Sequence, residues 1–158
     1  MTPIAEEILK RDNFLITAHI EPDGDAVGSS LAMLHALTLL GKCVCVCLSD
    51  FVPPLYRFLP GAERIERDLP PDFSPECVIV LDCSSLERTG RIQKQIRMFS
   101  PLIINIDHHQ GNSCYGDLSL VRNASATGEL IYDLIKTLNV KPSKEIGICL
   151  YTAILTDT

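Results

Sequence analysis

Residues 19–30 read His19-Ile20-Glu21-Pro22-Asp23-Gly24-Asp25-Ala26-Val27-Gly28-Ser29-Ser30, and this stretch decides how the chain folds. It follows the apolar run 14–18, which predicts a strand, and precedes a helical pattern over residues 28–40. Pro22 and Gly24 argue against one continuous helix, so we expect the polar side chains to project from a loop. One imidazole and two carboxylates in this loop suit a divalent cation, with Mn²⁺ preferred and Mg²⁺, Co²⁺ or Zn²⁺ as competitors.

The composition predicts one globular domain. The chain has 158 residues, of which 46% are hydrophobic and 22% charged, enough to bury a sizeable core. Its net charge of −6 provides no overall attraction to nucleic acid, so a phosphate ligand would need local cations. The apolar segments are too short to cross a bilayer, and residues 1–7 lack the features of a signal peptide. We therefore expect a cytoplasmic protein without a membrane partner.

The cysteines indicate a reducing compartment. There are seven, with no Cys-x-x-Cys pair among them. Cys43, Cys45 and Cys47 alternate with valine as in a buried strand, where residues two apart are separated by ~6.6 Å. That spacing is too wide for three sulfurs to share one Zn²⁺ without distortion. We interpret all seven as free thiols that pack as small hydrophobic side chains.

Strand and helix patterns alternate along the chain. Strands are expected over residues 14–18, 43–48, 77–81 and 102–106. Helices are expected over residues 1–12, 28–40, 87–99, 127–139 and from 144 to about 155, with Ile4, Ile8 and Leu9 on the packed side of the first and Ser143 capping the last. Residues 110–126 resemble a loop, and residues 62–69 show no clear preference. This order predicts an α/β fold with a mainly parallel sheet flanked by helices.

Three polar motifs follow directly after predicted strands. They are His19, Asp82 and the triplet Asp107-His108-His109. Each has an ordinary explanation alone, such as a solvated turn or a helix cap. In a parallel sheet, however, all three would meet at the carboxyl edge, where ligands bind. Familiar alternatives fail, because no glycine-rich nucleotide loop occurs and Leu34 stands where an EF-hand starting at Asp23 needs glutamate.

The motifs together resemble the four-motif pattern of the DHH phosphoesterases, the superfamily that includes RecJ-type exonucleases. The matching positions are His19-x-x-Pro22-Asp23-Gly24-Asp25-Ala26-x-Gly28-Ser29, then Asp82, then Asp107-His108-His109, then Asp157. The first motif and the segment 123–129 are most similar to the oligoribonuclease/pAp phosphatase branch. The resemblance implies a Rossmann-like DHH catalytic domain over residues 1–158, with its metal site at the carboxyl ends of the strands.

The resemblance also implies roles for individual residues. One metal ion would be held by His19, Asp23 and Asp82, and a second by Asp25, Asp82, His108 and Asp157. Asp107 would orient an imidazole and His109 would face the substrate phosphate, so these two are the expected catalytic residues. Two divalent ions would offset the four carboxylates and support in-line attack of water on phosphorus.

Further substrate contacts are open between two interpretations. Arg88 and Arg91 would either reach a phosphate or serve as solvated helix charges. Ser125 and Thr127 would either bind phosphate at a helix N-terminus or cap that helix. His35 lies within an apolar helix pattern, and we interpret it as a packed structural histidine.

The expected function is metal-dependent hydrolysis of phosphoester bonds in short oligoribonucleotides, in pAp, or in both. The alternatives are a cyclic- or linear-dinucleotide phosphodiesterase, a family II pyrophosphatase, and a metal-binding domain that is inactive in this form. Members of the family carry a C-terminal substrate-binding domain, which has no counterpart in these 158 residues. We therefore expect the chain to be the N-terminal catalytic domain of a longer protein, and a homodimer is also allowed.

Overall fold

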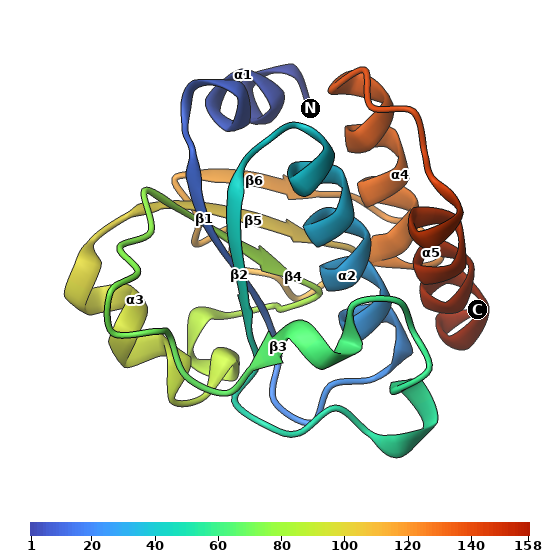
Figure 1. The fold of residues 1–158 in the computed structure, drawn as a ribbon, viewed down its shortest axis with the longest axis horizontal. Helices are drawn as coiled ribbons and strands as arrows, with labels where there is room; N and C mark the ends of the chain where they lie inside the picture. Colours follow the sequence, from blue (N-terminus) through green and yellow to red (C-terminus); the bar gives the residue numbers. More distant parts are fainter.

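All strands of the sheet run parallel, in the order β3-β2-β1-β4-β5-β6. The computed structural model describes residues 1–158 and confirms the predicted α/β class (Figure 1). The strands are β1 Asn13–Ala18, β2 Cys43–Cys47, β3 Ile65–Glu66, β4 Cys77–Leu81, β5 Leu102–Asp107 and β6 Leu118–Val121. The chain builds outward from β1 in one direction and from β4 in the other. The carboxyl ends of β1 and β4 therefore flank a topological switch point, where such sheets bind ligands.

The two edge strands were not predicted. β3 has only two residues and follows a short 3₁₀ turn, Ala62–Arg64, in the stretch that showed no preference. β6 lies within the segment expected to be a loop. Both strands are partly exposed, so neither carries the continuous apolar run that marks a strand buried on two faces.

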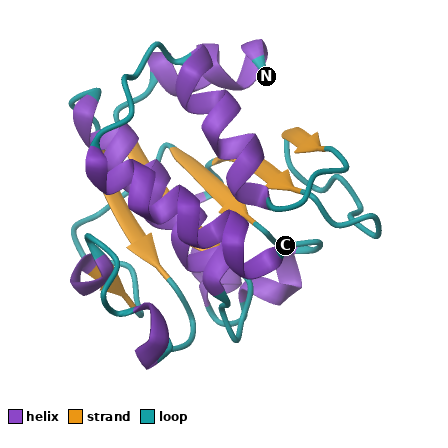
Figure 2. Ribbon diagram, turned by 90° about the vertical axis from the view of Figure 1, so that its right-hand side faces the viewer, coloured by secondary structure: helices purple, strands orange, loops and turns teal.

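The helices divide unequally between the two faces of the sheet. They are α1 Thr2–Lys10, α2 Gly24–Leu39, α3 Ile92–Phe99, α4 Thr127–Thr137 and α5 Lys144–Asp157. α1, α2, α4 and α5 share a large core with one face of the sheet, which includes Phe14 and Ile16 of β1. α3 packs with Leu15 on the opposite face, because successive side chains of a strand alternate. Figure 2 looks onto the larger helical layer. None of these helices has the length and hydropathy needed to cross a membrane.

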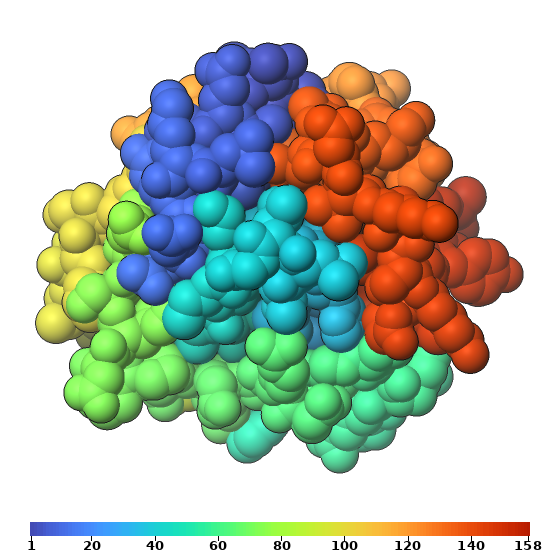
Figure 3. Space-filling view, turned by 45° about the horizontal axis from the view of Figure 1, so that its top comes forward, coloured from blue at the N-terminus to red at the C-terminus, as the bar shows by residue number.

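α1 closes one end of the large core. Ile4 and Ile8 are buried, but Leu9 is 53% exposed, so the prediction that Leu9 packs beside them is wrong. Residues four apart lie on one helix face, whereas Leu9 is turned away from Ile8 by about 100°. In the space-filling view the blue N-terminal segment lies against the cyan part of α2 and the orange-red end of α4 (Figure 3).

α2 begins four residues earlier than predicted. Asp23 is its N-cap, and the Asp23 side chain accepts a hydrogen bond from the backbone N–H of Ala26 at 3.0 Å. Asp25 therefore projects from the first helical turn and not from a loop. Gly24 and Gly28 allow α5 to approach closely, since a Cβ on Gly28 would lie 2.6 Å from the carbonyl oxygen of Cys149.

The predicted helix over residues 87–99 is wrong in its first part. Leu86–Thr89 forms a 3₁₀ turn, and α3 starts only at Ile92. The break falls at Gly90, whose φ of 65° is rarely adopted by other residues. A Cβ there would also lie 2.8 Å from Oγ of Ser49, so tertiary packing fixes the break.

All seven cysteines are free thiols, as predicted. Cys43 and Cys114 are exposed, however, so the prediction that every thiol is packed is wrong for these two. The sulfurs of Cys45 and Cys47 lie 3.4 Å apart, because the two side chains tilt toward each other along β2. No cysteine belongs to a group of side chains that could hold a metal ion.

Candidate metal centre

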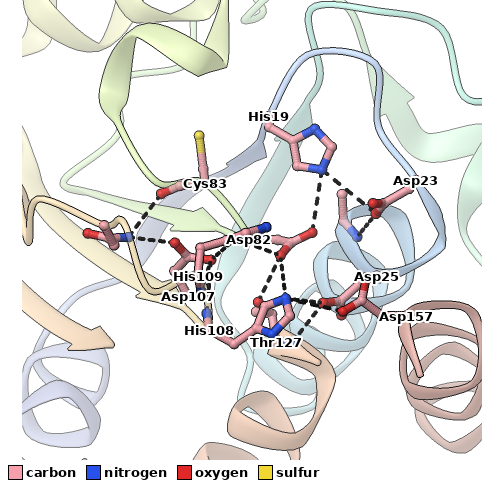
Figure 4. A network of polar contacts seen from close by, with 12 residues as sticks. His19, Asp23, Asp25, Asp82, Cys83, Asp107, His108, His109, Thr127 and Asp157 are labelled. Atoms are coloured by element: carbon pink, nitrogen blue, oxygen red, sulfur yellow. Dashed lines mark hydrogen bonds and ion pairs between the residues drawn. The ribbon is translucent and has the colours of Figure 1, made fainter. Parts of the chain in front are cut away.

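The polar motifs meet at the carboxyl edge of the sheet. His19 follows β1, Asp82 follows β4, and Asp107 is the last residue of β5. Asp25 reaches the same place from the first turn of α2, and Asp157 from the last turn of α5 (Figure 4). The convergence expected for a parallel sheet is thus present.

Three groups of potential metal ligands adjoin one another. Within each group the ligand atoms all lie within 4.8 Å of one another. The first group is His19, Asp23 and Asp82, the second is Asp25, His108 and Asp157, and the third is Asp82, His108 and His109. Asp82 joins two of them, because its Oδ2 lies 3.4 Å from Nε2 of His19 and its Oδ1 lies 3.5 Å from Nε2 of His108. Nε2 of His108 is also 3.2 Å from Oδ2 of Asp157. This geometry suits two neighbouring cations that share the Asp82 carboxylate.

Two imidazole rings are held so that Nε2 faces the centre. Nδ1 of His19 lies 2.6 Å from the carbonyl oxygen of Ile20, and Nδ1 of His108 lies 3.1 Å from that of Ala124. A carbonyl can only accept, so Nδ1 must donate and the neutral ring keeps its lone pair on Nε2. Nε2 of His108 is buried and has no hydrogen-bond partner. A buried atom of this kind needs a partner, and a cation bound by the surrounding carboxylates supplies one.

Asp82 adopts a backbone conformation that few residues tolerate. Its φ is 52°, in the left-handed region, and its side chain is almost fully buried. Its backbone N–H donates to the carbonyl oxygen of Ile106 at 3.0 Å, which ties the end of β4 to β5. Backbone strain of this kind persists only where the surrounding structure fixes it, and it is common at functional sites.

Asp25 is fully buried and is held by backbone groups of α4. Its two carboxylate oxygens accept hydrogen bonds from the N–H groups of Thr127 at 2.7 Å and Gly128 at 3.0 Å, and from Oγ of Ser29 at 3.0 Å. These bonds favour the ionised carboxylate. Burial and the nearby charge of Asp82 outweigh them and raise the pKa of Asp25 to about 7.

The surplus of negative charge at the centre raises the pKa values of His19 and His108. Burial by itself would lower the pKa of His19, but the carboxylates of Asp23 and Asp82 raise it to about 10. Contact with Asp82 raises the pKa of His108 to about 9 despite burial. Burial of Asp82 favours its neutral form, yet His108 and His19 hold its pKa below the usual range. A divalent cation at this centre would relieve the same imbalance of charge.

The two expected catalytic residues lie beside the ligand groups. Asp107 is fully buried, and its Oδ1 lies 2.6 Å from Nδ1 of His109. The ring of His109 is 49% exposed, whereas His19 and His108 are largely enclosed. His109 therefore combines a fixed Nδ1 with an accessible ring edge.

The residues predicted to touch substrate are placed differently from one another. Arg88 is exposed, and its side chain makes no hydrogen bond or ion pair. Arg91 turns away from the centre and binds the carbonyl of Arg67 and the carboxylate of Asp68. His35 lies outside the site, where its Nε2 is 2.8 Å from the carbonyl oxygen of Pro60, in agreement with a packed structural role.

The N-terminus of α4 is not capped by Ser125 or Thr127, and phosphate binding by these two residues stays a prediction. Its N-cap is Ala126, which offers no side-chain bond, and Ser125 instead hydrogen-bonds Glu129. The first N–H groups of the helix bind Asp25, and Oγ of Thr127 donates to Oδ1 of Asp82 at 3.1 Å. Thr127 thus supports two carboxylates of the candidate centre, a role that sequence reasoning missed.

Sequence reasoning also missed a group of polar side chains beneath Asp107, formed by Asn105, Asn112 and Tyr115. Asn105 is fully buried within β5 and donates to the carbonyl oxygens of Val80 and Cys83. The one available signal was the asparagine that interrupts the apolar run 102–106. Nothing in the spacing of Asn112 or Tyr115 pointed to this place.

Comparison with known proteins agrees with this geometry. The family model of the DHH family, N-terminal domain, matches residues 13–154. The chain therefore belongs to the DHH family, and the four motifs that resembled this family lie together in its structure.

Individual relatives align with nearly all of the chain. A protein of Thermus thermophilus named bifunctional oligoribonuclease and PAP phosphatase NrnA is 36% identical, with 98% of this chain and 47% of that protein aligned. The crystal structure of an exopolyphosphatase-related protein from Bacteroides fragilis has a TM-score of 0.90 at 28% identity and covers 99% of this chain and 49% of that one. RecJ from Thermus thermophilus in complex with Mn²⁺ shares the fold, with a TM-score of 0.52 at 16% identity, over 94% of this chain and 22% of that one. The chain spans about half the length of the curated relatives it matches.

Proposed function

We propose that this domain hydrolyses phosphoester bonds of short oligoribonucleotides, of pAp, or of both, with two divalent cations, Mn²⁺ preferred. The observation that carries the proposal is the position of Asp82, whose two oxygens each face the Nε2 of a different histidine. The buried Nε2 of His108, which makes no hydrogen bond and is surrounded by the carboxylates of Asp25, Asp82 and Asp157, supports it. The proposed substrates are those for which the NrnA relatives are named.

The chain's own groups have separate tasks in this proposal. Two divalent ions would supply Lewis-acid charge and activate water for attack on phosphorus. His19, Asp23, Asp25, Asp82, His108 and Asp157 would hold these ions. His109 would bind the substrate phosphate with its exposed ring edge, since Nδ1 is engaged by Asp107. Arg88 is exposed beside the carboxyl end of β4 and would be able to meet a second phosphate.

The proposal is tested by assaying the purified chain with Mn²⁺ on pAp, a diribonucleotide, a cyclic dinucleotide and pyrophosphate. We expect inorganic phosphate from pAp or mononucleotides from the diribonucleotide, and neither product from the Asp82→Asn variant. Preferred hydrolysis of the cyclic dinucleotide or of pyrophosphate would replace the proposed substrate class.

A second candidate function is metal binding without turnover by this chain alone. It is favoured by the fact that the chain matches only about half of its relatives' length. Stoichiometric binding of two ions together with no hydrolysis of any of the four substrates would support this candidate and overturn the first.

A further inference from the structure

Asp107 has two oxygens with different partners. Oδ1 accepts the backbone N–H groups of His108 at 2.9 Å and His109 at 3.3 Å, and it faces Nδ1 of His109. Oδ2 accepts one hydrogen bond, from Nδ2 of Asn112 at 2.6 Å. Without Asn112, Oδ2 would be a buried carboxylate oxygen without a donor, which is costly enough to favour another rotamer of Asp107.

Asn112 is itself fixed on both sides of its amide. Its Oδ1 accepts the backbone N–H of Cys114 at 2.7 Å, which closes a local turn. Its Nδ2 also lies 2.8 Å from Oδ1 of Asn105 and 3.3 Å from the carbonyl oxygen of Cys83. An N–H donor faces Oδ1 and oxygen acceptors face Nδ2, so the two ends of the amide can be told apart and its orientation is defined.

The contact with Cys83 links two loops of the candidate centre. Cys83 directly follows Asp82, and its carbonyl oxygen also accepts hydrogen bonds from Asn105 at 3.2 Å and from the hydroxyl of Tyr115 at 3.0 Å. One amide thus connects the loop after β4 with the loop after β5. The amide lies beneath the site, and both its oxygen and its nitrogen are engaged by protein groups.

We propose that Asn112 is a positioning residue, which holds Asp107 so that its Oδ1 receives Nδ1–H of His109 and the other ring nitrogen is turned toward substrate. This rests on the proposed function where turnover is concerned. Partners that orient metal-bound histidines typically contribute about 10- to 100-fold to metal affinity or activity, and we take the same range for a histidine oriented toward substrate. We expect a loss of turnover in that range when the amide is removed, with metal content unchanged.

The test uses Asn112→Ser. A serine hydroxyl still accepts the N–H of Cys114 and keeps the turn, but it is too short to reach Asp107. Gln110→Ser is the matched control, since Gln110 is an exposed amide of the same loop and makes no hydrogen bond. Circular dichroism and metal content identify any variant that fails to fold.

The first measurement is independent of turnover. Nitrogen-15 NMR of the metal-free chain, with the His109 ring neutral, reports which ring nitrogen carries the proton. We expect the Nδ1–H tautomer in the wild type and in Gln110→Ser, and a mixture of tautomers in Asn112→Ser. An unchanged tautomer in Asn112→Ser would overturn the proposal, even if the chain hydrolyses none of the substrates tested.

The second measurement is a double-mutant cycle on kcat. If Asn112 acts through His109, Asn112→Ser costs about 10- to 100-fold in the wild type and close to nothing in the His109→Ala background. Equal losses in both backgrounds would show a general structural effect and would contradict the proposal. Should neither protein turn over substrate, the proposed function fails while the NMR result still decides the role of Asn112.

Discussion

The backbone N–H of Thr127 donates to Oδ2 of Asp25 across 2.7 Å, and so joins the start of α4 to the start of α2. The two residues are 102 positions apart in the sequence. Asp157 arrives from the end of α5, which packs closely against α2. The position of these carboxylates therefore depends on how three helices pack. A change in that packing should move the carboxylates and weaken metal binding at the candidate centre.

Gly28→Ala should lower both stability and metal affinity. Alanine is normally better than glycine in a helix interior by about 1 kcal/mol. Here its Cβ would lie 2.6 Å from the carbonyl oxygen of Cys149 and 2.9 Å from Cβ of Ala153, and overpacking typically costs about 1–3 kcal/mol. We expect a net loss of about 1 kcal/mol, and at most about 2 kcal/mol, in the free energy of unfolding, measured with urea, and weaker metal binding as α5 moves away.

Gly147→Ala is the matched control. Gly147 lies in α5, and a Cβ there would meet nothing within 4 Å. We expect it to be neutral or stabilising, with unchanged metal affinity. If Gly28→Ala behaved like Gly147→Ala, close packing of α2 and α5 would not govern the site.

Asp82→Asn should abolish binding of two metal ions. Asparagine tolerates the left-handed φ of 52° and keeps the volume, so the change removes mainly the charge that faces both His19 and His108. Isothermal titration calorimetry with Mn²⁺ measures the stoichiometry, and Asp72→Asn, an exposed carboxylate elsewhere, serves as the control. Retention of two tight sites in Asp82→Asn would refute the shared-carboxylate assignment.

His109→Ala should leave metal content near normal and impair phosphate binding. The side chain of His109 is half exposed, and its Nδ1 is occupied by Asp107, so it is better placed for substrate than for an ion. Elemental analysis gives the metal content, and inhibition by inorganic phosphate reports anion binding. Loss of an ion would instead make His109 a ligand, through the group that it forms with Asp82 and His108.

Metal affinity should rise with pH. The raised pKa values of about 10 for His19, 9 for His108 and 7 for Asp25 mean that the metal-free chain holds protons at these groups near neutrality. Metal binding requires their deprotonated forms, so protons must leave, and affinity should increase between about pH 7 and pH 10. Calorimetry in buffers of different ionisation enthalpy counts the protons released; no release near neutral pH would contradict these protonation states.

The metal-free chain should lose stability as pH rises from about 6.5 to about 10. For His19 and His108 the folded pKa values exceed the ordinary value of 6.5, so their contribution to stability is complete below about pH 6.5. It is lost as pH rises through about 9 to 10. Urea unfolding of the metal-free chain at several pH values measures this loss, and a flat profile would contradict it.

Helices and central strands followed from the sequence, and the exceptions have identifiable causes. The core strands β1, β2, β4 and β5 are marked by apolar runs that suit burial on both faces. β3 and β6 are short edge strands, and their pairing depends on neighbours distant in sequence. The break at Gly90 depends on contact with Ser49, which no local pattern reveals.

The sequence by itself determined the α/β class and the set of chemistry-bearing motifs, because buried strands and the polar residues that end them are local features. Only the tertiary structure decided that Thr127 supports the carboxylates of Asp25 and Asp82, and that Asn112 is linked to the carbonyl oxygen of Cys83. Each of these contacts joins different elements of the fold. Hydrogen bonds of this kind form only after the helices and the sheet have packed, so they cannot be predicted from local propensity or spacing.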